Sequence, residues 1–274
     1  MDRATITGLL LTFGGVAVGV ALEGGHLAAL LSLSSFMIVI VGSVGAMVIA
    51  FQWHEVRRFY HCIQLVTRGT SHDWEGAIKR MIEVATLARR NGVLSLEPTI
   101  AKEQNEFIKI ALRMMVDGAD SDALSDVLES KLEAHHYQTK QDEKMFEMLG
   151  GFMPTMGIVG TVTSLIHVLG NLSEPEKLGA GVAAAFTATL YGVGIANMVV
   201  LPMGGKIRVV AREETEYFKM LLTGLVAVQS GDNPLWVEQK MRSYVPPHID
   251  AKVQSSGGKA KETKTTEGKA IPVA

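Results

Sequence analysis

Four long stretches of the chain carry no Asp, Glu, Lys or Arg and consist of apolar, small and hydroxyl residues. They run over residues 4–22, 33–51, 148–170 and 178–205. About 20 such residues in a helix suffice to cross the hydrocarbon core of a bilayer. A buried helix of a soluble protein could account for one stretch, but four in one chain predict four transmembrane helices.

The segment between the second and third stretches has a different pattern, in which apolar residues recur every three or four positions among charges. This spacing predicts amphipathic helices, separated where Gly, Pro and Asn interrupt it. The predicted helices cover residues 57–67, 73–90, 100–116 and 121–147. The expected fold class is all-α: a four-helix transmembrane protein with a large helical cytoplasmic domain inserted between the second and third transmembrane helices.

This pattern divides the chain into five parts. Residues 1–51 hold the first two transmembrane helices, 52–147 the cytoplasmic helical domain, and 148–205 the last two transmembrane helices. Residues 206–250 are expected to form a cytoplasmic helix with an extension. Residues 251–274 are rich in Lys, Thr, Gly and Ser and are expected to be a disordered tail.

Composition agrees with a membrane protein that has a soluble part. Hydrophobic residues make up 47% of the chain and charged residues 20%, and the charges are gathered in blocks. The net charge of −2 at pH 7 gives no bias toward nucleic acid, so no nucleic-acid partner is expected. The single cysteine, Cys62, cannot form an intramolecular disulfide and fits a reducing compartment. The first apolar run lacks an Ala-x-Ala cleavage site, which favours a retained helix over a signal peptide.

Basic residues orient the four helices. Thirteen Lys or Arg residues lie between Gln52 and Glu147, and eleven more follow Gly205. The linker of residues 23–32 has none, and that of residues 171–177 has one. Because loops rich in Lys and Arg stay in the cytoplasm, the long loop and both termini are expected there.

Small and hydroxyl residues line one face of each of the last two transmembrane helices, and each face includes a threonine, Thr161 or Thr189. At 1.5 Å per residue, these threonines lie roughly 21 Å from Glu147 and roughly 25 Å from Lys206 along their helices. Both hydroxyls are therefore expected near the middle of the bilayer. Close helix packing explains such residues as well as a cation path does, so both interpretations stay open.

Two prolines, Pro154 and Pro202, lie near the cytoplasmic ends of the same two helices. A proline in a membrane helix frees a backbone carbonyl and creates a bend point, so the pair predicts helices that flex against the cytoplasmic domain. No Asp, Glu, Lys or Arg lies in any of the four stretches, although cation and proton relays use an ionisable group inside the membrane. The chain therefore either conducts no ions or borrows a carboxylate from a partner helix.

Four strings of residues resemble a known family: LEGGHLAALL, NGVLSLE, FMPTMGIVGTV and AAFTATLYGVGIANMVVLP. On these strings the chain is identified as a member of the MotA/PomA family of flagellar motor stator proteins, which is related to the ExbB/TolQ proton-channel energisers. The similarity covers residues 1 to about 244. It implies a homopentameric ring in the bacterial inner membrane, in contact with lipid, around a MotB-like single-span partner with a membrane aspartate. Ion flow would then produce torque on the rotor protein FliG.

The resemblance also implies roles for seven residues. Torque coupling is assigned to Pro154 and Pro202. Rotor contact is assigned to Glu97 and Arg89, with Arg90 as the alternative to Arg89. The ion pathway is assigned to Thr161 and Thr189. Many proton-type members carry alanine at the position of Thr161, where sodium-type members carry a threonine whose hydroxyl could help to coordinate Na⁺. The neighbouring sodium-type threonine is Ala188 here, and LEGGH resembles proton-type loops. The expected ion is H⁺, with Na⁺ as the alternative, and no cofactor is expected.

Other functions fit part of this pattern. An ExbB/TolQ-like energiser of outer-membrane processes would have three spans, and a non-conducting membrane scaffold would not explain the paired prolines. No nucleophile motif, phosphate loop or paired carboxylates indicate an enzyme.

Glu133, His135, His136 and Asp142 share a predicted helix, but adjacent histidines diverge by about 100°. These four are therefore expected to be surface residues, and no metal site is expected.

Overall fold

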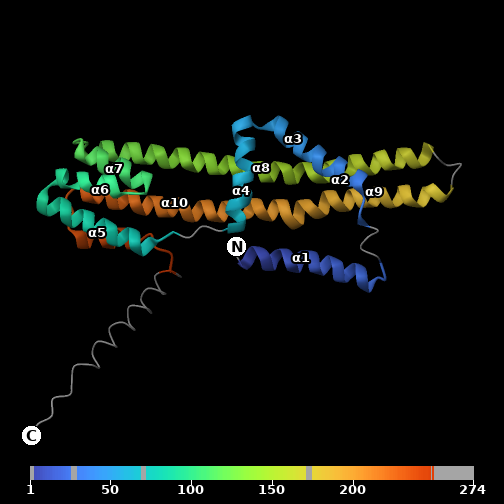
Figure 1. Ribbon diagram of the computed structural model, residues 1–274, viewed down its shortest axis with the longest axis horizontal. Coiled ribbons are helices and arrows are strands. Elements are labelled where there is room, and N and C mark those ends of the chain that lie inside the picture. Colours follow the sequence, from blue (N-terminus) through green and yellow to red (C-terminus); the bar gives the residue numbers. More distant parts are fainter. Residues whose placement is uncertain (1–2, 26–29, 69–71, 171–174, 248, 250–274) are drawn as a thin grey trace, which may run out of the picture. The chain divides into compact units, whose positions relative to one another are not determined.

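The computed structural model is helical throughout its regular elements, which confirms the all-α class (Figure 1). The residues that it describes are 3–25, 30–68, 72–170, 175–247 and 249. The expected tail of residues 251–274 lies outside them. The chain divides into two compact units, unit 1 (Met1–Ser71 and His135–Arg212) and unit 2 (His72–Ala134 and Glu213–Ala274).

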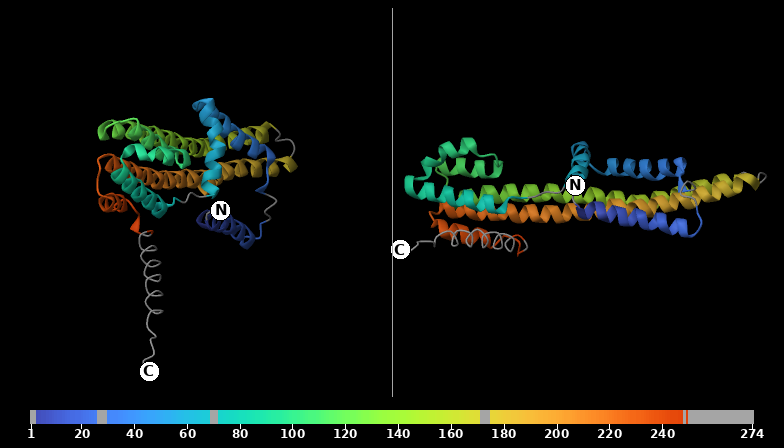
Figure 2. Two further views of the ribbon diagram at one scale, coloured as in Figure 1. Left: turned by 60° about the vertical axis from the view of Figure 1, so that its left-hand side comes forward. Right: turned by 60° about the horizontal axis from the view of Figure 1, so that its bottom comes forward.

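Unit 1 contains the four transmembrane helices, each long and apolar enough to cross a bilayer. The first is α1 (Arg3–Leu22), and the second consists of α2 (Leu33–Phe36), the π-helical turn η2 (Met37–Val41) and α3 (Gly42–Ala50). The third lies within α8 (Ser121–Gly170). The fourth consists of α9 (Pro175–Ile195), the π-helical turn η4 (Ala196–Val200) and the first turns of α10 (Leu201–Gln229). Figure 2 shows α8 and α9 side by side.

The amphipathic helix α4 (Trp53–Arg68) follows the second transmembrane helix and crosses α8 steeply (Figure 1). Its Phe59 ring stacks on Phe146 of α8, with ring centroids 4.6 Å apart. Cys62 and Val66 of α4 are buried in the same core as Met145 and Phe146. Apolar burial therefore fixes α4 on the stretch of α8 that precedes the third transmembrane helix.

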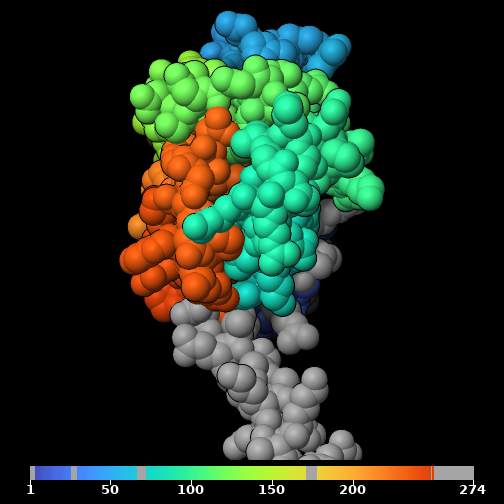
Figure 3. Space-filling view, turned by 90° about the vertical axis from the view of Figure 1, so that its left-hand side faces the viewer, coloured from blue at the N-terminus to red at the C-terminus, as the bar shows by residue number. Residues whose placement is uncertain are grey.

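Unit 2 is a helical domain with one apolar core. Its elements are α5 (Trp74–Asn91), the 3₁₀ turn η3 (Val93–Leu96), α6 (Glu97–Lys102), α7 (Glu106–Val116), α11 (Pro234–Arg242) and the adjoining parts of α8 and α10. In Figure 3 the teal surface of α5 lies directly against the orange-red surface of α10 and α11. Trp74 of α5, 1% exposed, and Met241 of α11, 0% exposed, belong to this core.

The structure differs from the sequence-based prediction in two helices. The predicted helix over residues 100–116 is two helices, α6 and α7, because Asn105 caps α7 by accepting the backbone N–H of Phe107 at 3.0 Å. Pro98 does not separate two helices but lies in the first turn of α6, where its missing N–H costs no hydrogen bond. The predicted helix over 121–147 and the third transmembrane helix form the single 50-residue α8, with Pro154 inside it.

Candidate ion pathway and torque-coupling site

The two threonines expected near the middle of the bilayer are in contact. Thr161 Oγ1 of α8 lies 2.6 Å from Thr189 Oγ1 of α9. It also lies 3.0 Å from the carbonyl oxygen of Gly157 and 3.0 Å from that of Ala185. Each hydroxyl carries one hydrogen, so a Thr161 that donates to a carbonyl must accept its bond from Thr189. Within the described residues nothing else holds Thr189 Oγ1, whose lone pairs remain open to a ligand from outside this chain.

One helical turn away from Thr161 and Thr189, glycines bring the backbones of α8 and α9 together. A Cβ on Gly157 would lie 3.3 Å from Gly192 Cα, and a Cβ on Gly192 would lie 2.6 Å from Met153 O. Close packing of small residues, one of the two interpretations left open by the sequence, is therefore present. It does not displace the other, because this same close approach sets the distance between the two threonine hydroxyls.

Pro154 lies half-buried inside α8. As a proline, it offers no N–H to the carbonyl of Gly150, four residues earlier. A Cβ on Gly150 would lie 2.5 Å from Leu201 Cδ2, so the turn before Pro154 packs on the residue that precedes Pro202. Pro202 is therefore level with the turn before Pro154, whereas Met153 O, next to Pro154, faces Gly192 of α9. The prediction that both bend points lie at one depth is not met, because Pro154 lies at least one turn further along the helix pair than Pro202.

Pro202 is exposed and lies two residues after the end of the π-helical turn η4. There the N–H of Leu201 donates to Ala196 O, five residues back, instead of the usual four. Pro202 also borders a hollow of about 320 Å³ between α1 and the fourth transmembrane helix, which Gly8 and Asn197 help to line. A wide turn and a proline in succession leave the backbone of this stretch less tightly bonded than the α-helix on either side.

Arg208 ties α8 to α10 just outside the uncharged stretches that contain the two prolines. Its guanidinium pairs with Glu143 and with Glu147, whose Oε1 lies 2.7 Å from Arg208 Nη2. Glu143 and Glu147 are four residues apart and so share one face of α8. The helix pair is thus fastened next to the stretch that contains Pro202 and, at least one turn further on, Pro154, and this stretch is left as the place where it can bend.

The three predicted rotor-contact residues are exposed in unit 2. Arg89 and Arg90 lie in the last turn of α5, and Glu97 begins α6 after the turn η3. Gly92, with φ of 82°, makes the corner between them in a conformation that favours glycine. Helix dipoles favour cations at a C-terminus and anions at an N-terminus, so these positions would suit the charges even without a partner.

One ion pair was not anticipated from the sequence. Arg58 of α4 binds Asp142 of α8 with two hydrogen bonds, Nη2 to Oδ2 at 2.7 Å and Nε to Oδ1 at 3.3 Å. The prediction of a surface position for Asp142 was wrong, because the residue is only 6% exposed. Asp142 lies on the same helix face as the buried Met145 and Phe146. A carboxylate among apolar residues on one helix face was the feature of the sequence that could have indicated a buried ion pair.

The pair also controls the chemistry of the cysteine next to it. Burial of Cys62, followed by the negative charge of Asp142 and a hydrogen bond to it, raises the pKa of the thiol to about 12. The positive charge of Arg58 acts in the opposite direction but is the smaller effect. Cys62 is therefore a protonated core residue at neutral pH, not a nucleophile.

A tyrosine ties the connection before α2 to α9. The Tyr191 hydroxyl donates to Leu30 O at 2.6 Å and accepts the N–H of Ser32 at 3.2 Å. Ser35 Oγ of α2 donates to Ala184 O at 3.0 Å, which adds a third hydrogen bond between this region and α9. As for metals, the described part of the chain contains no group of three or more His, Cys, Asp or Glu that could hold an ion.

Known proteins match this chain over nearly its whole length. Residues 99–220 match the MotA/TolQ/ExbB proton channel family, and residues 6–92 match the N-terminal region of motility protein A. Motility protein A of Helicobacter pylori is 32% identical over 257 residues, which cover 94% of this chain and 100% of the relative.

Two solved structures match as well. The structure of C. jejuni MotAB has a TM-score of 0.85 at 30% identity and covers 90% of this chain and 97% of that one. The flagellar MotAB stator complex from Bacillus subtilis has a TM-score of 0.83 at 29% identity, over 92% of this chain and 99% of that one. The resemblance found in the sequence is confirmed. The chain is a membrane protein that belongs to the motility protein A family, the ion-channel stator subunits of the flagellar motor.

Proposed function

We propose that this stator subunit forms a homopentameric ring around a MotB-like single-span partner in the bacterial inner membrane, with both termini in the cytoplasm. The ring conducts H⁺ through the complex and converts the flow into torque on the rotor protein FliG. The observation that carries the proposal is the contact of Thr161 with Thr189 inside transmembrane helices that contain no carboxylate. A hydroxyl pair can relay or orient an ion but cannot take up and release a proton near neutral pH, so an ionisable partner group is required.

The partner is supported by the two solved structures, which are MotAB complexes. A single membrane aspartate on the partner would lie next to Thr189, whose hydroxyl oxygen has lone pairs open to a proton donor or to water. A carboxylate in this position would be protonated and deprotonated as ions pass.

The choice of H⁺ over Na⁺ is supported by the hydrogen bonds of Thr161. Sodium is a hard cation that needs several oxygen ligands at once, whereas the Thr161 oxygen already contacts two carbonyls and one hydroxyl. Ala188, beside Thr189 in the sequence, contributes a buried methyl group and no further side-chain oxygen. Na⁺ remains the alternative, since the carbonyl oxygens of Gly157 and Ala185 lie close by.

Torque coupling in this proposal falls to Pro154 and Pro202. The Arg208 pairs hold α8 and α10 together on the cytoplasmic side, and the glycine contact holds α8 and α9 together in the membrane. Bending is thereby concentrated in the stretch between these two fastenings, which contains both prolines. Arg89, with Arg90 beside it, and Glu97 then present charges of both signs to the rotor.

The alternatives have less support. The TolQ and ExbB proteins share the family matched by residues 99–220, but residues 6–92 match motility protein A. A scaffold that conducts nothing would not need a hydroxyl pair at the middle of its spans. That the chain is no enzyme and binds no cofactor stays a prediction of the sequence.

The experiment that tests the proposal reconstitutes the chain in liposomes with and without the single-span partner. We expect H⁺ uptake, driven by a membrane potential, only for the complex, and its loss when the partner's membrane aspartate is replaced by asparagine. Cation flux through the purified chain alone would contradict the borrowed carboxylate. Swimming speed measured against Na⁺ concentration at fixed pH separates the two ions, because an H⁺-driven motor keeps its speed without Na⁺.

A further inference from the structure

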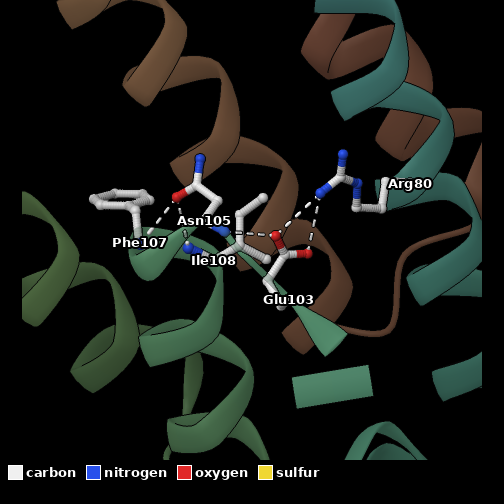
Figure 4. A network of polar contacts seen from close by, with 5 residues as sticks. All are labelled: Arg80, Glu103, Asn105, Phe107 and Ile108. Carbon is white, nitrogen blue, oxygen red and sulfur yellow. Dashed lines mark hydrogen bonds and ion pairs between the residues drawn. The ribbon is translucent and has the colours of Figure 1, made fainter. Parts of the chain in front are cut away.

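The break between α6 and α7 is held by a buried carboxylate (Figure 4). The side chain of Glu103 is 3% exposed and accepts a hydrogen bond from Arg80 Nη1 at 3.0 Å and from the backbone N–H of Asn105 at 2.8 Å. Asn105 in turn caps α7. A buried carboxylate with these donors fixes the direction in which α7 leaves α6, because any other direction would leave the charge unpaired.

The two helices set in this way enclose a hollow of about 470 Å³. Its lining includes Glu97 from α6, Lys109 and Arg113 from α7, and Asp117 directly after α7, together with the apolar Ile100 and Val116. Lys109 and Arg113 are four residues apart and therefore share one face of their helix. The hollow combines two cations with two carboxylates. One of these carboxylates, Glu97, is also a predicted rotor-contact residue.

The charges around the hollow are largely unneutralised within this chain. Lys109 reaches a carboxylate, that of Glu106, only at 4.0 Å. In the part of the chain that the structure describes, Arg113, Glu97 and Asp117 form no ion pair. Their charges are therefore available to a partner without first breaking an internal contact.

We propose that this hollow receives an acidic side chain of the rotor protein, held by Lys109 and Arg113, with a rotor cation beside Glu97. The inference rests on the proposed rotor contact and extends it from the corner at Gly92 to the adjoining face of α7. A protein surface with both charge signs fits, because Glu97 and Asp117 would repel a nucleic acid or another polyanion. The pairing of Arg80 with the buried Glu103 presets the hollow before the partner arrives.

The test compares rotor binding by purified complexes of the full-length chain with its single-span partner. We expect the double reversal Lys109→Glu with Arg113→Glu to weaken binding by about tenfold or more and to slow swimming, since reversed charges at a contact repel the partner. The matched control is Lys79→Glu with Lys131→Glu, the same change of net charge at two exposed lysines of unit 2. Substituting rotor Asp or Glu residues by Lys, one at a time, should restore binding to the double reversal at one position. Membrane level and thermal unfolding of the complex report whether each variant folds.

The outcomes separate this inference from the proposed function. If Arg89→Glu weakens rotor binding but the double reversal binds like its control, the hollow is not a docking site and the rotor contact stands. If none of these reversals changes binding, the rotor contact itself fails. Two further results would overturn the inference. One is inorganic phosphate that binds the original complex, but not the double reversal, without any effect on rotor binding, which indicates a small-anion site. The other is association of stator complexes with each other that the double reversal abolishes.

Discussion

Gly157 of α8 and Gly192 of α9 are in backbone contact, since a Cβ placed on Gly192 would lie only 3.0 Å from Gly157 Cα. This contact is one turn from Thr161 and Thr189, whose hydroxyls are 2.6 Å apart. The ion pathway proposed here therefore depends on a helix spacing that glycine alone permits.

Gly192→Ala should separate α8 from α9 and lengthen the distance between the two hydroxyls. Its methyl group would lie 2.6 Å from Met153 O, a backbone atom that cannot move without shifting α8. Overpacking of this kind costs about 1–3 kcal/mol. We expect lower H⁺ flux and slower swimming, together with a lower unfolding temperature of the purified complex. Gly151→Ala is the matched control, because a Cβ there meets nothing within 4 Å. Equal flux in the two variants would show that the spacing is not needed.

Thr189 should tolerate serine but not alanine or valine. Serine keeps the hydroxyl that bonds Thr161, whereas alanine removes it and valine replaces it with a methyl group of the same shape. Loss of one such hydrogen bond corresponds to about 1 kcal/mol, or roughly a fivefold change in an equilibrium or rate. We expect single-motor rotation at constant load to slow by a similar factor in Thr189→Ala and Thr189→Val and to stay near the original speed in Thr189→Ser. A Thr189→Val variant that rotates at full speed would show that the hydroxyl is not part of the ion pathway.

Much of the membrane part could be predicted from the sequence because its signals are local. The four uncharged stretches gave the transmembrane helices, and counting residues from Glu147 and Lys206 placed Thr161 and Thr189 at one depth, where the structure joins them. The polar contacts between helices were not predictable in this way. Arg58 and Asp142 are 84 residues apart in the chain, and no local pattern links them.

The break between α6 and α7 shows the same limit. Residues 100–116 have a continuous helical pattern of apolar positions, which predicted one helix. The actual break depends on Glu103, whose partner Arg80 lies 23 residues earlier on another helix. Tertiary pairing of a single carboxylate thus overrides a local helical preference that is worth only a few tenths of a kcal/mol per residue.

Pro154→Leu and Pro202→Leu should each stop rotation without removing the protein from the membrane. Leucine restores an N–H to the backbone, so α8 regains the bond to Gly150 O, and the stretch after η4 becomes as stiff as its neighbours. The stator should then conduct without bending, or fail to conduct, and tethered cells should not rotate. Membrane level and co-purification with the partner should match the original protein, which separates a coupling defect from misfolding. Normal swimming in both variants would exclude the prolines from torque coupling.

Cys62 should be alkylated far more slowly in the folded chain than after unfolding. Burial and the neighbouring Asp142 raise the pKa of its thiol to about 12, whereas a free cysteine titrates near 8.5. At pH 9 the folded protein then holds roughly 800-fold less thiolate than the unfolded chain, and below that pH the labelling rate of the folded protein should fall about tenfold per unit. Asp142→Asn removes a charge that disfavours the thiolate and leaves Arg58, which favours it, so labelling of the folded protein should accelerate. Glu143→Gln, one position along α8 and paired with Arg208, is the control that should leave the rate unchanged.

Iodoacetamide labelling of the detergent-solubilised complex, followed by mass spectrometry with and without denaturant, measures these rates. Equal rates in the folded and unfolded chain would mean that the Arg58–Asp142 pair does not enclose Cys62.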